Sequence, residues 1–269
     1  MSRSALKNIV RIMKEDNKPI EQCFLNDLKR SIELTERNNS RLPSQTYKPS
    51  GMNCIRQSYY QIKGYEPDRG DTSSALVGIC ESGTDRHERI QQDVINMWHN
   101  GMDCMYINVA DFVRSRQLND LEIVKEPDFA NKEYETKLYN KKYNISFLCD
   151  GIIKYKNKYY ILEIKTENSY KFMGRTGVDP SHHNQAIAYS LSFGINEVLF
   201  LYENRDICDK KAYLFNVTDE MRNKLISYIT NCNNYIENDI VPNKPNDVPK
   251  KTCSYCLYKK YCEVDNNAD

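Results

Sequence analysis

The stretch Asp150–Thr166, DGIIKYKNKYYILEIKT, is the part of this chain that decides its fold. Residues 145–155 and 158–166 are rich in isoleucine and tyrosine, as β-strands are. The two residues between them, Lys156 and Asn157, suit a two-residue turn. This segment therefore predicts a β-hairpin.

The predicted hairpin brings acidic side chains together. A turn at residues 156–157 pairs Asp150 with Glu163, and alternation along the strand puts Lys165 on the same face as Glu163. Two carboxylates held close together repel each other, so this pairing predicts a cation between them. Oxygen ligands suit Mg²⁺ or Mn²⁺, which polarise a phosphodiester and lower the pKa of a bound water. The alternative at this point is a surface salt-bridge cluster on a solvated strand face.

The rest of the chain predicts an α/β protein with a central mixed sheet flanked by helices. With 269 residues, 40% of them hydrophobic, it can bury the core of one large domain. Apolar spacing and turn residues predict helices at 5–38, 53–64, 73–100, 180–193 and 218–237. Further strands are expected at 121–124, 137–139, 198–202 and 212–217.

The composition bears on compartment and partners. Ten cysteines would suit a disulfide-bonded secreted protein, but the first residues, MSRSALKNIVRIMKED, contain no apolar run typical of a signal peptide. No segment is apolar enough to span a membrane. We therefore expect a protein of the reducing cytoplasm. The formal net charge of +1 neither requires nor excludes a nucleic-acid partner.

Four cysteines have the arrangement of a metal site. Cys54 stands alone, whereas Cys253, Cys256 and Cys262 follow a C-x2-C-x5-C pattern that can offer three thiolates from one short segment. If Cys54 supplies the fourth ligand, the site closes a loop of about 200 residues, a cost that grows only logarithmically with length. Spacing alone leaves zinc and iron-sulfur open. The other six cysteines are expected to be ordinary thiols.

Taken together, these motifs resemble a known family. Asp150 followed by Glu163-Ile164-Lys165 resembles the core of the PD-(D/E)xK nucleases in their RecB-like branch. Gly83-x3-His87 upstream and Gln185-x3-Tyr189 downstream resemble that branch's histidine and Q-x3-Y motifs. The pattern Cys54-x-Arg56-x3-Tyr60, with the C-terminal cysteines, is similar to the iron-sulfur subgroup, which includes the CRISPR-associated RecB-like exonucleases, the AddB nuclease domain and many phage proteins.

The resemblance implies a role for each matching residue. The catalytic divalent ion would be bound by His87, Asp150, Glu163 and the carbonyl of Ile164. Lys165 would position the attacking water, and Gln185 and Tyr189, one helical turn apart, would touch that lysine or the DNA backbone. Cys54, Cys253, Cys256 and Cys262 would hold a four-iron, four-sulfur (4Fe-4S) cluster, with zinc as the alternative occupant. Expected DNA contacts are Arg56, Tyr60, Lys251, Lys259 and Lys260.

We therefore expect an Mg²⁺- or Mn²⁺-dependent DNA exonuclease on a restriction-endonuclease-like core. Residues 1–45 would be a helical extension and residues 46–269 the nuclease domain. The substrate would be single-stranded DNA or DNA with single-stranded ends, in recombination, repair or CRISPR adaptation. Partners would be a helicase, a recombinase or a CRISPR integrase, and no membrane. The alternative is a nuclease-fold DNA-binding or assembly subunit whose hydrolytic activity is absent or dispensable.

Overall fold

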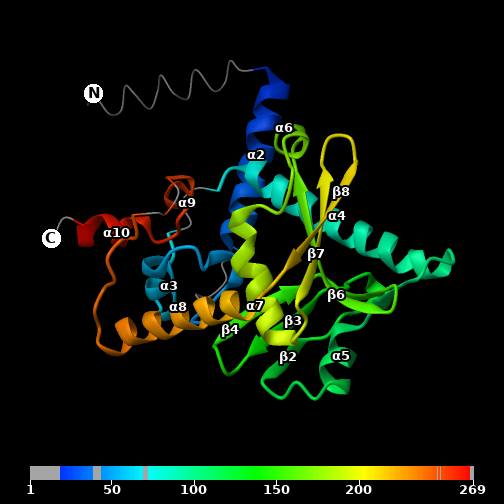
Figure 1. The fold of residues 1–269 in the computed structure, drawn as a ribbon. Helices are drawn as coiled ribbons and strands as arrows, with labels where there is room; N and C mark the ends of the chain where they lie inside the picture. The colour runs from blue at the N-terminus through cyan, green and yellow to red at the C-terminus, as the bar shows by residue number, and fades with distance from the viewer. Residues whose placement is uncertain (1–18, 39–43, 69–71, 247, 249, 267–269) are drawn as a thin grey trace, which may run out of the picture. The chain divides into compact units, whose positions relative to one another are not determined.

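The computed structural model describes residues 19–38, 44–68, 72–246, 248 and 250–266 (Figure 1). The side chains of residues 250, 251, 265 and 266 lie outside this description. The described residues belong to two compact units. The expected boundary at residue 45 stays a prediction, and residues 1–18 and 39–43 of the expected extension lie outside the described residues.

The first unit contains helix α2 (Ile20–Asn38) and the beginning of helix α4 (Ser74–His99), up to Ser82. Its α2 helix buries no residue. The backbone N–H of Ser74 donates to Glu33 Oε1 at 3.1 Å, which joins the two helices of this unit. The sequence predicted both helices.

The second unit carries the sheets and every predicted site residue. Its helical elements are η1 (Pro49–Gly51), α3 (Ile55–Ile62), the rest of α4, α5 (Val109–Ser115), η2 (Phe129–Asn131), α6 (Ser169–Met173), η3 (Pro180–His182), α7 (His183–Phe193), α8 (Asp219–Glu237), α9 (Lys250–Ser254) and α10 (Lys259–Asn266). Its strands are β1 (Cys104–Ile107), β2 (Leu121–Lys125), β3 (Thr136–Asn140), β4 (Ile145–Cys149), β5 (Gly151–Tyr155), β6 (Lys158–Glu167), β7 (Glu197–Asn204) and β8 (Lys210–Asn216).

Two sheets form within this unit. The larger has five strands in the order β1-β5-β6-β7-β8, and its pairs are antiparallel except for the parallel pair β6–β7. The smaller sheet, β2-β3-β4, is antiparallel. The mixed sheet flanked by helices confirms the predicted α/β class. The separate smaller sheet and the elements β1, α5 and α6 were not predicted.

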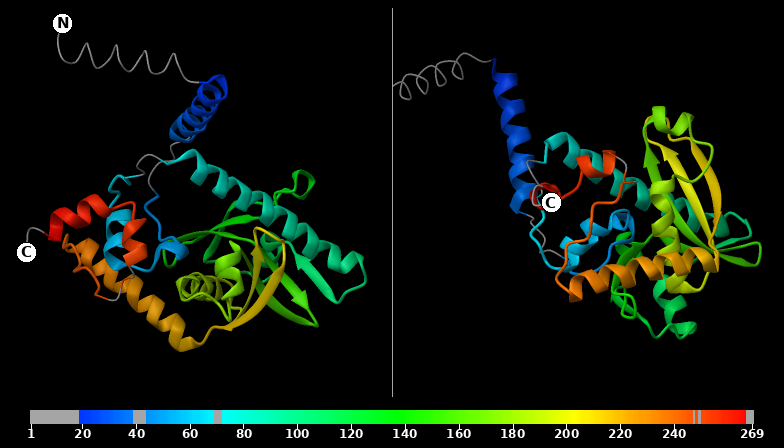
Figure 2. Two further views of the ribbon diagram at one scale, coloured as in Figure 1. Left: turned by 90° about the horizontal axis from the view of Figure 1, so that it is seen from above. Right: turned by 60° about the vertical axis from the view of Figure 1, so that its left-hand side comes forward.

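Helices cover both faces of the five-stranded sheet, as Figure 1 and Figure 2 show for α4 and α7. Alternation along the strands divides the apolar side chains between these faces. One face packs against α4 through Ile90, Val94, Cys104, Ile153, Leu162 and Ile164. The other packs against α7 through residues that include Ile152, Ile161, Phe200, Ala186, Ile187 and Phe193. Leu162 and Ile164 therefore lie in the core, on the face of β6 opposite Glu163 and Lys165.

Local signals place two helix ends as predicted. The Thr218 side chain accepts from the Met221 N–H at 3.3 Å and begins α8. Gly194, with φ of +69°, ends α7 in the left-handed conformation that glycine adopts without strain.

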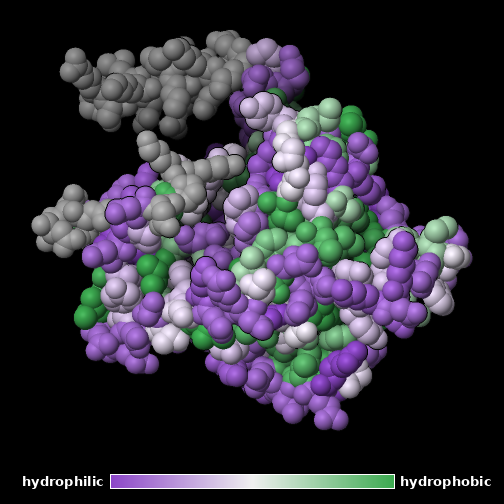
Figure 3. Space-filling model, viewed as in Figure 1, coloured by the Kyte–Doolittle hydropathy of each residue, from purple (hydrophilic) through white to green (hydrophobic). Residues whose placement is uncertain are grey.

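The exposed surface is a mosaic, with hydrophobic residues gathered in the middle of the face drawn in Figure 3 and hydrophilic residues around them. Among the described residues, no helix combines the length and apolar character needed to cross a bilayer.

Candidate active site and four-cysteine pocket

The hairpin that carries the acidic residues has the predicted register. Strands β5 and β6 pair antiparallel with Gly151 opposite Leu162. Lys156 and Asn157 have φ values of +47° and +65°, the two positive values that a type I′ hairpin turn requires. Asp150, just before β5, therefore lies level with Glu163 at the point where β5 begins.

Asp150 is held by three neighbours. Its backbone carbonyl accepts from Gln91 Nε2 at 2.6 Å and from the Tyr106 hydroxyl at 2.5 Å. Its carboxylate Oδ2 accepts from the Ile164 N–H at 2.6 Å. These bonds hold Asp150 at the point where the chain passes from one sheet to the other. The prediction of one strand over 145–155 is wrong, since β4 and β5 belong to different sheets and the chain passes between them at Asp150.

His87 and Glu135 meet Asp150. His87 Nδ1, from α4, is 3.2 Å from Asp150 Oδ1 and 3.8 Å from Glu135 Oε1. One potential ligand atom from each of the three residues lies within 4.8 Å of the others. The predicted juxtaposition of His87 with Asp150 is present. Glu135 was missed, because it stands in a loop before β3 and no spacing in the sequence connects it with the hairpin.

Glu163 is the least exposed acid of the site. It is 2% exposed, and its Oε1 accepts from Lys165 Nζ at 2.5 Å. Its other oxygen, Oε2, is buried and has no hydrogen-bond partner among the described residues. A buried acceptor without a partner costs free energy, and such groups are rare in folded proteins. This orphaned oxygen lies on the hairpin beside Asp150.

The Q-x3-Y motif on α7, Gln185 and Tyr189, contacts Lys165 through Gln185. Lys165 Nζ donates to Gln185 Oε1 at 3.0 Å, so the expected contact between Gln185 and this lysine is present. Gln185 Nε2 donates to the Tyr189 hydroxyl at 2.7 Å, and that hydroxyl donates to the Leu148 carbonyl at 2.7 Å. Tyr189 is only 2% exposed. It therefore orients Gln185, and of the two expected contacts, with the lysine or with the DNA backbone, Tyr189 reaches the lysine only through Gln185.

The acids of the site differ in proton affinity. Burial raises the pKa of Glu163 to about 7, and the Asp150 carboxylate adds to this against the opposing charge of Lys165. Burial, together with Asp150, likewise raises the pKa of Glu135 to about 7. Burial also acts on Asp150, but the charges of His87 and Lys165 outweigh it and lower its pKa.

The two basic residues respond in the opposite sense. Burial alone would lower the pKa of His87, but the Asp150 carboxylate outweighs it and raises this pKa. Burial is likewise outweighed at Lys165, whose pKa is raised by Glu163 and Asp150. Lys165, and His87 when it is protonated, therefore place positive charge against the Asp150 carboxylate.

These residues fit a divalent cation. The carboxylates of Glu135 and Asp150 with the His87 imidazole form the group of gathered ligand atoms, and Mg²⁺ and especially Mn²⁺ accept such ligands. Among the described residues Glu163 is not part of this group, and its role as a ligand stays a prediction. The orphaned Glu163 Oε2 is an oxygen that such an ion would satisfy. The Ile164 N–H is used by Asp150, and the role of the Ile164 carbonyl as a ligand stays a prediction.

The four predicted cysteines share one pocket. Cys54, at the N-cap of α3, and Cys253, Cys256 and Cys262 from the C-terminal segment all line a cavity of about 80 Å³. Burial raises the pKa of the Cys54 and Cys256 thiols, and the neighbouring sulfurs raise it further. Residues about 200 positions apart in the sequence therefore meet, as predicted.

The shape of this pocket bears on its occupant. Tetrahedral zinc, with Zn–S bonds of about 2.3 Å, would hold its sulfurs roughly 3.8 Å apart. Among the described residues, no three of these four sulfurs gather within 4.8 Å of one another. A cavity that holds a single water needs only about 10–15 Å³, so this cavity of about 80 Å³ is larger than a one-water site. Which metal or cluster would occupy it stays a prediction.

Arg56 and Tyr60 build the wall of this pocket. Arg56 is 3% exposed and donates from Nε to the Pro242 carbonyl at 2.7 Å, while its NH1 lies 3.6 Å from Cys262 Sγ. Tyr60 is fully buried, with its ring 5.7 Å from that of Tyr261. The expectation that Arg56 and Tyr60 contact DNA is therefore wrong, because both side chains are buried at the cysteine pocket.

The three predicted lysine contacts keep their status as predictions. Lys259 lines the rim of the pocket and pairs with Glu263 at 3.5 Å. Lys260 is exposed, with its Nζ 4.9 Å from the ring centre of Tyr261. The side chain of Lys251 lies outside the described part of the chain.

Comparison with known proteins adds little to this description. No family model matches the chain, and no curated protein matches it. Among solved structures, 17 chains match. One, described as "Crystal structure of SSO0001", is 17% identical, with 90% of this chain and 97% of that chain covered and a TM-score of 0.45. The chemistry of the site must therefore be inferred from its residues.

Proposed function

We propose that this protein is a metal-dependent DNA exonuclease of the RecB-like PD-(D/E)xK type with an iron-sulfur cluster. The observation that carries the proposal is the buried, unpartnered Glu163 Oε2 beside Asp150 and Lys165. A salt-bridge cluster on a solvated strand face, the alternative reading of the sequence, would leave these groups exposed and paired with water. Here Asp150 and Glu163 are 5% and 2% exposed.

The residues divide the work of hydrolysis among them. His87, Glu135, Asp150 and Glu163 would hold the divalent ion, which when bound polarises the phosphodiester and acidifies a water. Lys165, whose raised pKa keeps it charged, would orient that water and offset the charge that develops on the phosphate.

Two further contacts fix this geometry. The Ile164 N–H fixes one oxygen of the Asp150 carboxylate. Gln185 holds the Lys165 ammonium from the side of α7. Both contacts keep charged groups in place before substrate arrives, so little reorganisation accompanies the reaction.

The four-cysteine pocket would hold the iron-sulfur cluster as a structural element. Arg56 NH1 approaches Cys262 Sγ at 3.6 Å, and hydrogen bonds to ligand sulfurs help to set the reduction potential of such clusters. The segment is also tied to the region of α3 by the Asp68 N–H, which donates to the Leu257 carbonyl at 2.7 Å. Cluster binding would add to this connection, because metal binding to folded thiolates contributes folding free energy.

The nuclease proposal is tested with end-labelled single-stranded DNA and anaerobically purified protein in Mg²⁺ or Mn²⁺. Shortening from one end, absent without the metal and absent in Glu163→Gln and Lys165→Ala, is the expected result. Glu122→Gln, an exposed acid on β2, is the matched control and should cleave normally. A circular single strand should stay intact. A folded wild-type protein that cleaves neither substrate would overturn the enzyme and favour a DNA-binding subunit.

The cluster is tested separately by metal analysis. We expect about four irons and four acid-labile sulfides per chain, reduced in Cys256→Ser and unchanged in Cys208→Ser, an exposed cysteine outside the pocket. One zinc per chain without sulfide would overturn the iron-sulfur assignment and leave the nuclease proposal standing.

A further inference from the structure

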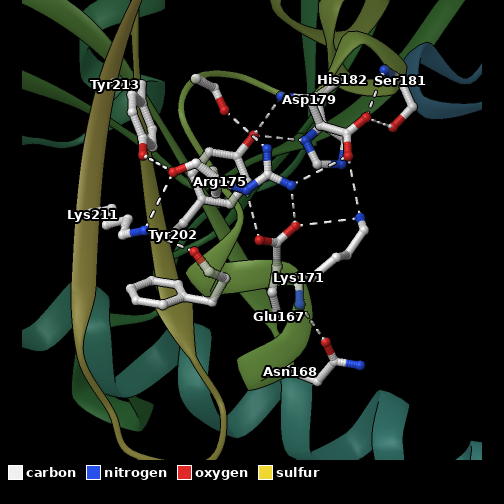
Figure 4. Close-up of polar contacts among 12 residues, drawn as sticks. Glu167, Asn168, Lys171, Arg175, Asp179, Ser181, His182, Tyr202, Lys211 and Tyr213 are labelled. Atoms are coloured by element: carbon white, nitrogen blue, oxygen red, sulfur yellow. Dashed lines mark hydrogen bonds and ion pairs between the residues drawn. The ribbon is translucent and has the colours of Figure 1, made fainter.

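A dense polar network holds the segment between β6 and α7, residues 168–182 (Figure 4). Glu167, the last residue of β6, accepts from Arg175 Nε at 2.6 Å, from Arg175 NH2, and from Lys171 Nζ at 3.3 Å. Arg175 NH2 and Lys171 Nζ also reach Asp179 Oδ2, at 3.3 Å and 3.2 Å. Since Glu167 is 5% exposed, this network anchors the segment to the end of the strand that carries Lys165.

Arg175 fixes the backbone of the segment from a second side. Its guanidinium carbon lies 4.2 Å from the ring centre of Tyr202, a cation–π contact. Its carbonyl accepts from the Tyr213 hydroxyl at 2.8 Å and from Lys211 Nζ at 3.3 Å. The loop is thus tied to β6, β7 and β8 at once, and it presents the next residues, Asp179 to His182, in a fixed position.

Tyr202 sets the tautomer of His182. The Tyr202 side chain is fully buried, and its hydroxyl oxygen accepts from the Asp179 N–H at 3.2 Å. A buried hydroxyl also needs an acceptor for its proton. Among the described contacts, His182 Nδ1, at 2.9 Å, is the acceptor available to it. With Nδ1 accepting, the ring proton of neutral His182 is on Nε2.

Strand register and helix spacing place His182 beside the catalytic lysine. Lys165 on β6 and Tyr202 on β7 are paired neighbours in the parallel ladder. His182 and Gln185, three residues apart at the start of α7, lie on one helical face. Gln185 contacts Lys165, and His182 contacts Tyr202. Because Lys165 and Tyr202 are neighbours on adjacent strands, His182 lies next to the Gln185–Lys165 pair.

His182 is a neutral donor in this position. Burial, with a further contribution from the Lys165 charge, lowers the pKa of His182 to about 4. The side chain is nevertheless partly exposed, and no described residue hydrogen-bonds to Nε2. A neutral imidazole donates a hydrogen bond to an anion without adding a positive charge that would compete for Asp150 and Glu163.

We propose that His182 is a substrate-binding residue that donates its Nε2–H to a non-bridging phosphate oxygen of the nucleic-acid strand beside Lys165, with Tyr202 as its positioning residue. This inference rests on the proposed nuclease function and names a contact that the sequence motifs do not include. The neighbouring cations Lys171 and Arg175 are already paired with Glu167 and Asp179, whereas His182 Nε2 has no protein acceptor among the described contacts.

Three substitutions of one residue test the proposal. His182→Gln places an amide donor near the Nε2 position, His182→Asn places one near Nδ1, and His182→Ala removes both. Binding of a fluorescent single-stranded oligonucleotide is measured by anisotropy in Ca²⁺, and cleavage is measured in Mn²⁺. Loss of one hydrogen bond to a charged group weakens binding about 10- to 100-fold, which we expect for Asn and Ala, whereas Gln should stay within roughly threefold of wild type.

The outcomes separate the alternatives. Wild-type affinity and KM in the Asn and Ala variants would overturn the proposal, and equal losses in Gln and Asn would show that His182 acts only through the fold. Thermal midpoints of all three variants should stay near wild type, and Tyr202→Phe should weaken DNA binding less than His182→Ala. A wild-type protein that binds the strand without cleaving it would defeat the nuclease proposal, while the Gln–Asn contrast in affinity would still decide the role of His182. A wild type that does not bind the strand would overturn both.

Discussion

Two buried glutamates on neighbouring strands, Glu163 on β6 and Glu203 on β7, have opposite surroundings. Glu203 is fully buried and is contacted by three cations, with Oε1 3.0 Å from Arg86 and 2.6 Å from Arg89 and Oε2 3.2 Å from Lys210. Glu163 is nearly as inaccessible, but among the residues that the structure describes it pairs with one cation, Lys165, and its Oε2 has no hydrogen-bond partner. At Glu203 both carboxylate oxygens have cationic partners, which makes a complete ion cluster. At Glu163 one oxygen has no partner among the described residues, which makes an incomplete cluster.

The same difference appears in proton affinity. Burial raises the pKa of both carboxyls, but at Glu203 the hydrogen bonds from Arg89, Arg86 and Lys210 outweigh it and the pKa is lowered. At Glu163 burial prevails and raises the pKa to about 7. A buried carboxylate whose oxygens are all paired with the protein's own cations stabilises the fold. A buried carboxylate with an unpaired oxygen, close to other acids, is suited to binding an external cation.

The largest expected effect is on catalysis. Glu163→Gln should reduce metal-dependent DNA cleavage by about 10³-fold or more, because it removes a ligand and an electrostatic contact of the reacting centre. Glu203→Gln is the matched control on the next strand, and folded protein of that variant should keep its activity per molecule. Rates on single-stranded DNA, normalised to the folded fraction, make the comparison. Equal losses in both variants would erase the distinction between the two glutamates.

The free energy of unfolding should show the reverse order, with a larger loss in Glu203→Gln than in Glu163→Gln. Glu203→Gln leaves three cations around a neutral amide and should lower the free energy of unfolding by about 2–3 kcal/mol, below the loss for a fully buried pair because Arg89 and Lys210 reach solvent. Glu163→Gln in metal-free buffer should lose less or gain stability. Denaturant unfolding of both variants measures this. A larger loss in Glu163→Gln would mean that its site is the structural one.

Added Mn²⁺ should stabilise only the incomplete cluster. At a free concentration ten times the dissociation constant, binding adds about 1.4 kcal/mol to the unfolding free energy of the wild type. Glu203→Gln should gain as much, whereas Glu135→Gln and Glu163→Gln should gain less. Thermal melts with and without Mn²⁺ provide the readout. An undiminished gain in Glu135→Gln would remove this residue from the ligand set.

The smallest expected effect is a difference in pH dependence without divalent metal. Glu163 has a raised pKa in the folded state, so its contribution to stability is complete below its ordinary value near 4.5 and is lost as pH rises through about 7. Relative to Glu163→Gln, the wild type should therefore lose stability between pH 5 and 8. We expect about 1 kcal/mol, because Asp150 and Glu135 redistribute protons with Glu163.

Glu203 should show the opposite slope. Its lowered pKa means that its contribution is present above the ordinary value and is lost as pH falls through the folded-state pKa. Unfolding measured from pH 3 to 8 for wild type and both variants separates the two contributions. Identical pH profiles for Glu163→Gln and wild type would contradict the raised pKa.

Much of the site could be predicted because its signals are local. The register of Asp150 against Glu163 follows from a two-residue turn at Lys156 and Asn157, and the spacing of Gln185 and Tyr189 follows from one turn of helix. The sheet change at Asp150 could not be predicted. The contacts that hold Asp150 there come from Gln91 and from Tyr106, which lies on an unrecognised strand, and no spacing in the sequence signals either contact.

The sequence by itself determined the hairpin, the residues that carry the proposed chemistry and the four cysteines of the pocket, because turn preference, side-chain alternation and motif spacing act over a few residues. Only the tertiary structure brought Glu135 to His87 and Asp150, left one oxygen of Glu163 without a partner, buried Arg56 and Tyr60, and set His182 beside Lys165. Burial and long-range proximity arise from how distant segments meet, and no short stretch of sequence encodes them.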